Sequence, residues 1–213
     1  MIRDDPYYIS AVGALGEGSS NSLSKDTDLA LAIGTKLADF TTGSWANFEN
    51  PNFKLVSVNT ARFDTTKHLA TSVISDAKIG LQQISDARGD WTAPNTWYQR
   101  AIKERDEWDA YVEKQSGPTN QEEPSYAHAV GAVYRNSDPS DIVVTAAGGL
   151  VGEVVQVWKP KQLNTFETEW GFSCMGYEIS GALGIKMAKP DQDVVVFVGD
   201  GSYLLNNLSL IHI

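Results

Sequence analysis

Short apolar runs separated by polar loops dominate this chain. In the first half, apolar residues on both faces mark the runs Leu29 to Gly34 and Lys54 to Asn59; in the second half they mark Ile142 to Gly149 and Val194 to Val198. Strands that are apolar on both faces are typical of a parallel sheet covered by helices. The pattern therefore predicts an α/β protein with a parallel sheet.

Helical periodicity lies between these runs. Apolar spacing predicts a helix over residues 75–88, with Ser75 or Asp76 as its N-cap. Further helices are expected over residues 95–115, over residues 126–136 and in the segment that carries Met175, Ile179, Ala182, Leu183 and Lys186. The glycine- and serine-rich stretch 13–22 predicts a flexible loop.

A change in composition divides the chain. Residues 92–125 are polar, charged and aromatic, and their last part, QSGPTNQEEPS, contains proline and has no periodicity. Such a segment is typical of a linker between domains. We therefore expect a first domain over residues 1–91, a helical linker over residues 92–125 and a second domain over residues 126–213.

Charge and composition exclude several classes of protein. The 213 residues are 42% hydrophobic, and 27 acidic against 17 basic residues give a net charge of -10. This charge repels a nucleic acid backbone, so no nucleic acid partner is expected. Since no apolar run reaches the ~20 residues that span a bilayer and no signal segment is visible, we expect a cytoplasmic protein with no membrane partner. The single cysteine, Cys174, excludes an internal disulfide and is expected to be a small buried residue.

Glycines follow both strands of the second half. Gly148 and Gly149 come after one strand, and Gly199 and Gly201 flank Asp200 after the other. Ligands of parallel sheets lie beyond the carboxyl ends of the strands, where glycines let backbone N–H groups approach a diphosphate. A carboxylate such as that of Asp200 suits Mg²⁺. Gly-Asp-Gly alone is short enough to be only a turn.

The run VVVFVGDGSY, preceded by GFSCMGYEISGALGIKMA, resembles the thiamine-diphosphate-binding domain of thiamine-dependent enzymes. The resemblance implies that residues 126–213 belong to that domain and that residues 1–91 form the Rossmann-like central domain of the same enzymes. It also implies thiamine diphosphate and Mg²⁺ as cofactors. In GALGEG the glycines do not form the dinucleotide fingerprint, so nucleotide binding by the first domain is not favoured.

The resemblance also assigns roles to residues. It makes Asp200 the metal ligand, Met175 the apolar prop beneath the bent cofactor, and Ser173 the residue whose carbonyl meets the aminopyrimidine. The other cofactor contacts that it implies are Gly148, Gly149, Leu150, Gly199, Gly201 and Ser202.

Within the family, DFTTGSW and AAGGLVGE are similar to the acylhydrolases of inositol catabolism. The implied reaction is hydrolysis of a C–C bond in a small, cyclic, polyol-derived dione, which opens the ring to 5-deoxy-glucuronate. The resemblance further implies a homodimer or higher homo-oligomer. Two alternatives stay open: a carboligase or decarboxylase with the same cofactor, similar to acetolactate synthase, and a non-catalytic α/β module that binds a diphosphate.

Two parts of the family's pattern have no counterpart in these residues. They are the glutamate that activates the cofactor, expected in an N-terminal domain, and a second metal ligand beyond Ile213. Asn206 and Asn207 come too soon after Asp200 and are expected in the helix that follows the motif. We therefore expect an inactive portion of a longer enzyme, with an ending, LSLIHI, that need not be native.

Other polar residues favour structural roles. His68 and His128 belong to different expected domains, so a paired metal site is not favoured. Ser202 is not in a nucleophile elbow, because Leu204 stands where that motif requires glycine. An exposed acidic loop, or the lining of a substrate entrance, is expected at Glu167, Glu169 and Trp170.

Overall fold

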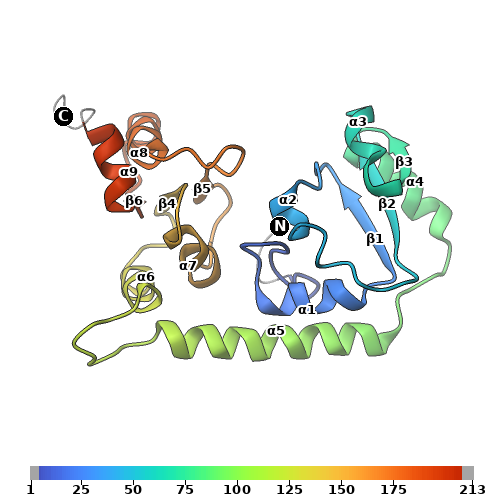
Figure 1. The fold of residues 1–213 in the computed structure, drawn as a ribbon, viewed down its shortest axis with the longest axis horizontal. Coiled ribbons are helices and arrows are strands. Elements are labelled where there is room, and N and C mark those ends of the chain that lie inside the picture. Colours follow the sequence, from blue (N-terminus) through green and yellow to red (C-terminus); the bar gives the residue numbers. More distant parts are fainter. Residues whose placement is uncertain (1–4, 208–213) are drawn as a thin grey trace. The chain divides into compact units, whose positions relative to one another are not determined.

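The computed structural model describes residues 5–207, which divide into two compact units. One unit comprises Ile9–Trp108, and the other comprises residues 5–8 with residues 109–207. Each contains a three-stranded parallel sheet with helices beside it (Figure 1). The predicted α/β class is confirmed. The division falls inside the expected linker 92–125, and the ending 208–213 lies outside the described residues.

The sheet of the Ile9–Trp108 unit has the order β1-β2-β3. Its strands are β1 (Leu29–Ile33), β2 (Lys54–Asn59) and β3 (Thr71–Ile74). Leu29 pairs with Lys54, and Val56 pairs with Thr71. The core gathers at the middle of this sheet, where Val58 is fully buried. Two of the three strands match the predicted runs; β3, a short and largely polar strand, carries too weak a periodicity to predict.

The helices of this unit are α1 (Gly18–Asp26), α2 (Asp39–Thr42), α3 (Arg62–Thr65), the 3₁₀ helix η1 (Lys67–Leu69), α4 (Ala77–Arg88) and α5 (Asn95–Ser116), the last of which continues past the division. Asp76 caps α4, because its carboxylate accepts hydrogen bonds from the N–H groups of Lys78 and Ile79. Of the two predicted caps, Asp76 is therefore the correct one. The predicted helix 95–115 is also confirmed.

The prediction of a flexible loop over residues 13–22 is wrong from Gly18 onward, where α1 begins. Two of the serines in this stretch, Ser19 and Ser20, are buried and bond to the backbone: the Ser20 hydroxyl donates to the carbonyl of Glu17 (3.0 Å). Gly18 also packs closely, since a Cβ there would lie 2.6 Å from the ring of Trp108. Hydrogen bonding and close packing therefore offset the weak helical propensity of this stretch.

The sheet of the second unit has the order β5-β4-β6. Its strands are β4 (Ile142–Thr145), β5 (Phe166–Thr168) and β6 (Val194–Val196). Val143 pairs with Phe166 and Ile142 with Val194, both in parallel. All four residues of β4 are buried, as expected of a central strand with helices on its faces.

The helices of the second unit are α6 (Tyr126–Arg135), α7 (Leu150–Val157), α8 (Tyr177–Ala188) and α9 (Asp200–Asn206). Ser125 and His128 form a capping box that begins α6. Ala182 of α8 packs on Ile142 and Val144 of the central strand. Within residues 5–207, no helix is both long and apolar enough to span a membrane.

Two predicted strands extend too far, because the chain leaves the sheet early to form turns. The central strand ends at Thr145 rather than Gly149, and Gly148 has a left-handed φ of 82°. The edge strand ends at Val196 rather than Val198. Met175 does not belong to the helix predicted around it, since α8 begins at Tyr177, after Gly176 with a φ of 93°.

Candidate functional site

Three segments leave the second sheet at the same edge. β4 runs into residues 146–149, β5 runs into Glu169, and β6 runs through two further residues into Gly199 and Asp200. Because the strands are parallel and in register, their carboxyl ends share one edge, the usual place for a ligand of such a sheet. Six of the nine residues expected from the sequence lie on these segments or on the connection that follows β5; Leu150 is the first residue of α7, and Gly201 and Ser202 lie in the first turn of α9.

The turn after β4 is bare, which here means that its exposed backbone is not covered by side chains. Gly148 and Gly149 are exposed, and a Cβ placed on either would meet nothing within 4 Å. Gly149 is the N-cap of α7, and Leu150, half-buried, is its first residue. Unpaired N–H groups at a helix N-terminus, beside open space, suit an anion.

The turn after β6 presents the carboxylate. Gly199 caps α9 and also has open space at its Cβ position. Asp200 is exposed, and its Oδ1 accepts a hydrogen bond from the N–H of Gly201 (2.8 Å). Ser202 is 4% exposed, so its hydroxyl is hidden from solvent. Asp200 is therefore the accessible ionisable group of the turn.

Met175 reaches the same turn from the connection between β5 and α8. A Cβ on Gly201 would lie 3.3 Å from Cε of Met175, and the Met175 side chain is 50% exposed. The tertiary fold thus brings the expected prop next to the expected metal turn. Ser173, two residues earlier, is exposed with a left-handed φ of 52°.

Glu169 organises the loop that leads to Met175. Its carboxylate accepts hydrogen bonds from the N–H groups of Phe172 (2.8 Å) and Cys174 (2.7 Å). These bonds, led by that from Cys174, lower the pKa of the Glu169 carboxyl. The acidic loop is therefore folded around one of its own carboxylates, a role that the sequence interpretation did not include.

Cys174 is exposed, so the prediction of a buried packing residue is wrong. Partial desolvation and the nearby carboxylate of Glu169 raise the pKa of the Cys174 thiol. A raised pKa disfavours the thiolate, so the residue is not an activated nucleophile.

The lowered pKa of Glu169 predicts a pH-dependent loop. The carboxylate holds the loop above the ordinary carboxyl pKa, and this contribution is lost as the pH falls through the lowered value. We expect the amide proton shifts of Phe172 and Cys174 to titrate together at acid pH, below the ordinary pKa of a glutamate carboxyl, in an NMR titration. Glu169→Gln should abolish this joint titration, and shifts that still moved together in that variant would contradict the assignment.

Glu178 is a second carboxylate that sequence reasoning missed. It is fully buried in the first turn of α8. Its Oε1 accepts from the N–H of Ala147 (3.1 Å), and its Oε2 accepts from the N–H of Gly176 (2.9 Å). It therefore connects the turn after β4 with the loop before α8.

The structure gives structural roles to His68, His128 and Asn206, which the sequence analysis did not favour as metal ligands. His68 stacks on Trp45, with 4.0 Å between ring centroids, and His128 takes part in the cap of α6. Asn206 is helical, as predicted, and its side chain occupies the space beside Gly176. Among residues 5–207 no three His, Cys, Asp or Glu side chains group as a metal site, so Asp200 belongs to no such group there.

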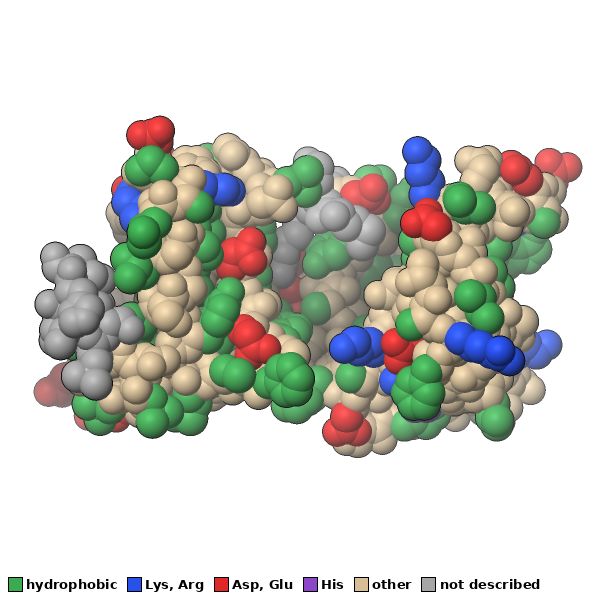
Figure 2. Space-filling model, turned by 90° about the horizontal axis from the view of Figure 1, so that it is seen from above, with side chains coloured by type: hydrophobic (Ala, Val, Ile, Leu, Met, Phe, Trp, Pro, Cys, Tyr) green, Lys and Arg blue, Asp and Glu red, His purple; other side chains and the backbone are tan. Residues whose placement is uncertain are grey.

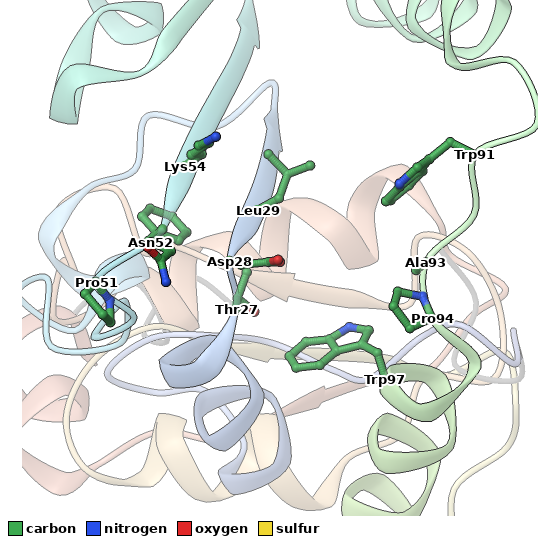
Figure 3. A pocket seen from close by; sticks show the side chains of 11 residues that line it. Thr27, Asp28, Leu29, Pro51, Asn52, Lys54, Trp91, Ala93, Pro94 and Trp97 are labelled. Atoms are coloured by element: carbon green, nitrogen blue, oxygen red, sulfur yellow. The ribbon is translucent and has the colours of Figure 1, made fainter.

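A cavity of about 780 Å³ lies in the Ile9–Trp108 unit. Leu29 and Lys54, the first residues of β1 and β2, contribute to its lining, so it lies at the amino edge of that sheet. Figure 3 shows Pro51, Asn52 and Lys54 on one side, Trp91, Ala93 and Pro94 on the other, and Asp28 between them. The nine residues expected to bind cofactor or metal all belong to the other unit.

Comparison with known families shows to which family the chain belongs. Residues 146–213 match the C-terminal TPP-binding domain of thiamine pyrophosphate enzymes, and residues 1–84 match the central domain of these enzymes. This chain belongs to the thiamine pyrophosphate enzyme family. The resemblance seen in the sequence is confirmed for both domains, and the family supports thiamine diphosphate (thiamine pyrophosphate) as cofactor.

Two curated relatives of this thiamine pyrophosphate enzyme chain are named 3D-(3,5/4)-trihydroxycyclohexane-1,2-dione hydrolase. The protein of Clostridium tetani (strain Massachusetts / E88) is 34% identical over 95% of the chain. That of Geobacillus thermodenitrificans (strain NG80-2) is 32% identical over 97%. The chain spans 35% of the length of each of these two relatives.

The residues present fit the diphosphate end of thiamine diphosphate. Bare backbone at Gly148 and Gly149 leaves room for phosphate oxygens, and the exposed Asp200 offers an oxygen ligand for a divalent cation. In addition, the hydroxyl of Thr145, at the end of β4, is buried without a hydrogen-bond partner among the described residues. A buried hydroxyl of this kind is stabilised by a polar group or water at the same edge.

Proposed function

We propose that this chain supplies the diphosphate- and metal-binding side of the active site in a thiamine-diphosphate-dependent hydrolase. The proposed enzyme hydrolyses a C–C bond of a small, cyclic, polyol-derived dione and opens its ring to 5-deoxy-glucuronate in myo-inositol degradation. The names of the relatives at 32–34% identity support this reaction. The observation that carries the site assignment is the meeting of Met175 with the Gly-Asp-Gly turn at the edge where Gly148 and Gly149 are bare.

Each residue has a separate proposed role. The N–H groups of Gly148, Gly149 and Leu150 bind diphosphate oxygens, since no side chain lies in the way. Asp200 ligates Mg²⁺ together with the diphosphate, and Gly199, Gly201 and Ser202 shape the turn that presents it.

Met175 and Ser173 orient the cofactor's rings in this proposal. The half-exposed Met175 side chain provides an apolar support, and the left-handed turn at Ser173 presents the backbone carbonyl to the aminopyrimidine. Thiamine diphosphate, when bound, supplies a carbanion that adds to a carbonyl and then accepts the electrons of the broken C–C bond. The protein contributes orientation and shape.

A substrate comparison tests the reaction. The complete gene product, with thiamine diphosphate and Mg²⁺, is assayed for ring opening of the trihydroxycyclohexanedione, for decarboxylation of 2-oxo acids and for their carboligation. The proposal expects ring opening to dominate. Dominant decarboxylation or carboligation would assign the chain to another reaction of the family, and the absence of cofactor binding would favour a non-catalytic module.

Further proposals follow from family resemblance. We propose a cytoplasmic homodimer or higher homo-oligomer whose active site lies between subunits. Sedimentation of the complete gene product checks the oligomeric state, and a monomer that retains full activity would contradict a site shared between subunits.

Gly149→Ala separates cofactor binding from folding. Alanine fits the φ of -66° and ψ of -31° without strain, and its methyl group meets no atom within 4 Å. The methyl would, however, occupy the space proposed for the diphosphate. We expect affinity for thiamine diphosphate, measured by titration calorimetry with Mg²⁺, to fall about tenfold or more, or about 1.4 kcal/mol. The free energy of unfolding should change by less than about 0.5 kcal/mol. Unchanged affinity would remove Gly149 from the proposed contacts.

A further inference from the structure

We propose that Glu178 is a positioning residue that locks together the two loops between which the cofactor binds. This inference rests on the proposed function, because it concerns the same thiamine diphosphate site. Glu178 belongs neither to the Gly-Asp-Gly turn nor to the glycine turn, and it is buried beneath both loops that it joins.

Both oxygens of the carboxylate are used. The N–H of Ala147 donates to Oε1 and the N–H of Gly176 donates to Oε2, at 3.1 and 2.9 Å. The side chain is 0% exposed, so water does not replace these donors. A buried carboxylate is costly unless its oxygens are hydrogen-bonded, and bonds from N–H groups to an ionised acceptor are among the stronger ones.

The two N–H groups that bond to Glu178 belong to residues next to expected cofactor contacts. Ala147 is followed by Gly148, the first bare glycine of the β4 turn. Gly176 follows Met175, the side chain that meets Gly201. One carboxylate therefore fixes the backbone one residue away from the proposed diphosphate cradle and one residue away from the proposed prop.

Apolar burial does not hold the second of these loops. Hydrophobic side chains reach the surface of both units (Figure 2), and in this loop Phe172 is 90% exposed and Met175 is 50% exposed. The turn at Gly176 has a left-handed φ of 93°, and as N-cap it provides no side-chain hydrogen bond to α8. Hydrogen bonds to the carboxylates of Glu169 and Glu178 thus restrain the loop backbone at three N–H groups, those of Phe172, Cys174 and Gly176.

The carboxylate is specific in this role. Glutamine has the same shape but only one acceptor atom, and its amide group would face one of the two N–H donors. A buried N–H group without a hydrogen-bond acceptor destabilises the conformation that buries it, so the loop adopts other conformations. Glu178→Gln should therefore release one of the two loops while leaving the apolar contacts of α8 in place.

The test compares four forms of the complete gene product: the wild type, Glu178→Gln, Glu122→Gln and Val130→Ala. Glu122→Gln, in the exposed segment before α6, controls for the change of charge. Val130→Ala removes buried volume from α6, which supplies none of the proposed contacts, and so controls for lost stability. Amide hydrogen exchange is measured without cofactor, and thiamine diphosphate affinity is measured with Mg²⁺ well below each melting temperature.

We expect Glu178→Gln to speed exchange at Ala147 or Gly176 at least about tenfold and to weaken thiamine diphosphate about tenfold or more. Val130→Ala should lower the melting temperature without weakening the cofactor, and Glu122→Gln should change neither. If Glu178→Gln does not fold, Glu178→Asp, which keeps the charge but is one methylene shorter, is measured in its place with the same expectation.

Two results would overturn the inference. One is unchanged protection of both amides, and the other is a loss of affinity no larger than that of Val130→Ala. A wild-type complete gene product that binds no thiamine diphosphate would contradict the proposed function instead, and the exchange measurement would still decide whether Glu178 holds the loops.

Discussion

Asp200→Ala is expected to weaken thiamine diphosphate binding in the presence of Mg²⁺ by at least about a hundredfold, equivalent to about 2.7 kcal/mol. Asp200 is the carboxylate of the Gly-Asp-Gly turn, and the chain brings no cluster of three metal-binding His, Cys, Asp or Glu side chains to this edge within residues 5–207. A hard divalent cation needs several oxygen ligands, so the loss of this one should be severe. Titration calorimetry with and without Mg²⁺ measures the change.

Folding should be nearly unaffected by this substitution. Asp200 is exposed, and its carboxylate accepts a hydrogen bond from the N–H of the adjacent residue, Gly201. We expect the free energy of unfolding to change by less than about 0.5 kcal/mol. Asp191→Ala, at another exposed position of the same unit, is the control and should bind like the wild type. Mg²⁺-dependent binding that survived Asp200→Ala unchanged would remove the metal role from this residue.

Gly131→Ala is expected to have the largest effect on stability. A Cβ on Gly131 would lie 2.1 Å from the backbone oxygen of Ser116. Because this clash is with the backbone, no change of side-chain rotamer can remove it. That oxygen also accepts a hydrogen bond from Arg135 (2.6 Å). Helix α6 would have to move away from the end of α5, and we expect a loss of about 3 kcal/mol in the free energy of unfolding, measured in urea.

Gly184→Ala is the matched control in the same unit. Gly184 lies in α8, and a Cβ there would meet nothing within 4 Å. Alanine should stabilise this helix by about 0.5–1 kcal/mol, because it favours the helical backbone more than glycine does. The same substitution at two helical glycines is thus expected to change the free energy of unfolding in opposite directions. A Gly131→Ala protein as stable as the wild type would show that α6 and α5 separate without cost.

Much of the fold follows from local pattern. The runs at β2, α5 and α6 are long or strongly periodic, and the structure places them within one or two residues of the prediction. β3 and β5 have four and three residues and gain their pairing from neighbouring strands, so no local signal identifies them. In α1, buried serines have a polar pattern that is typical of a loop until their hydrogen bonds are seen.

The site was predictable where it consists of a motif and not where it depends on a partner distant in the sequence. Glycines and Asp200 at the ends of apolar runs indicate a ligand edge from sequence alone. Glu178 has no such signal, because a glutamate in the first turn of a helix is ordinarily a surface residue. Its partner, Ala147, belongs to another strand's turn, and only the packing of α8 against β4 brings the two together.

By itself the sequence determined the α/β class, the family and the residues of the Gly-Asp-Gly turn, because these depend on apolar periodicity and on a short motif of adjacent residues. The tertiary structure decided that Met175 meets Gly201, that Cys174 is exposed, and that two carboxylates hold the loop between β5 and α8. These features depend on contacts between segments that parallel strand pairing brings to one edge. Burial and hydrogen bonding at that edge are properties of the folded chain, which residue order does not display.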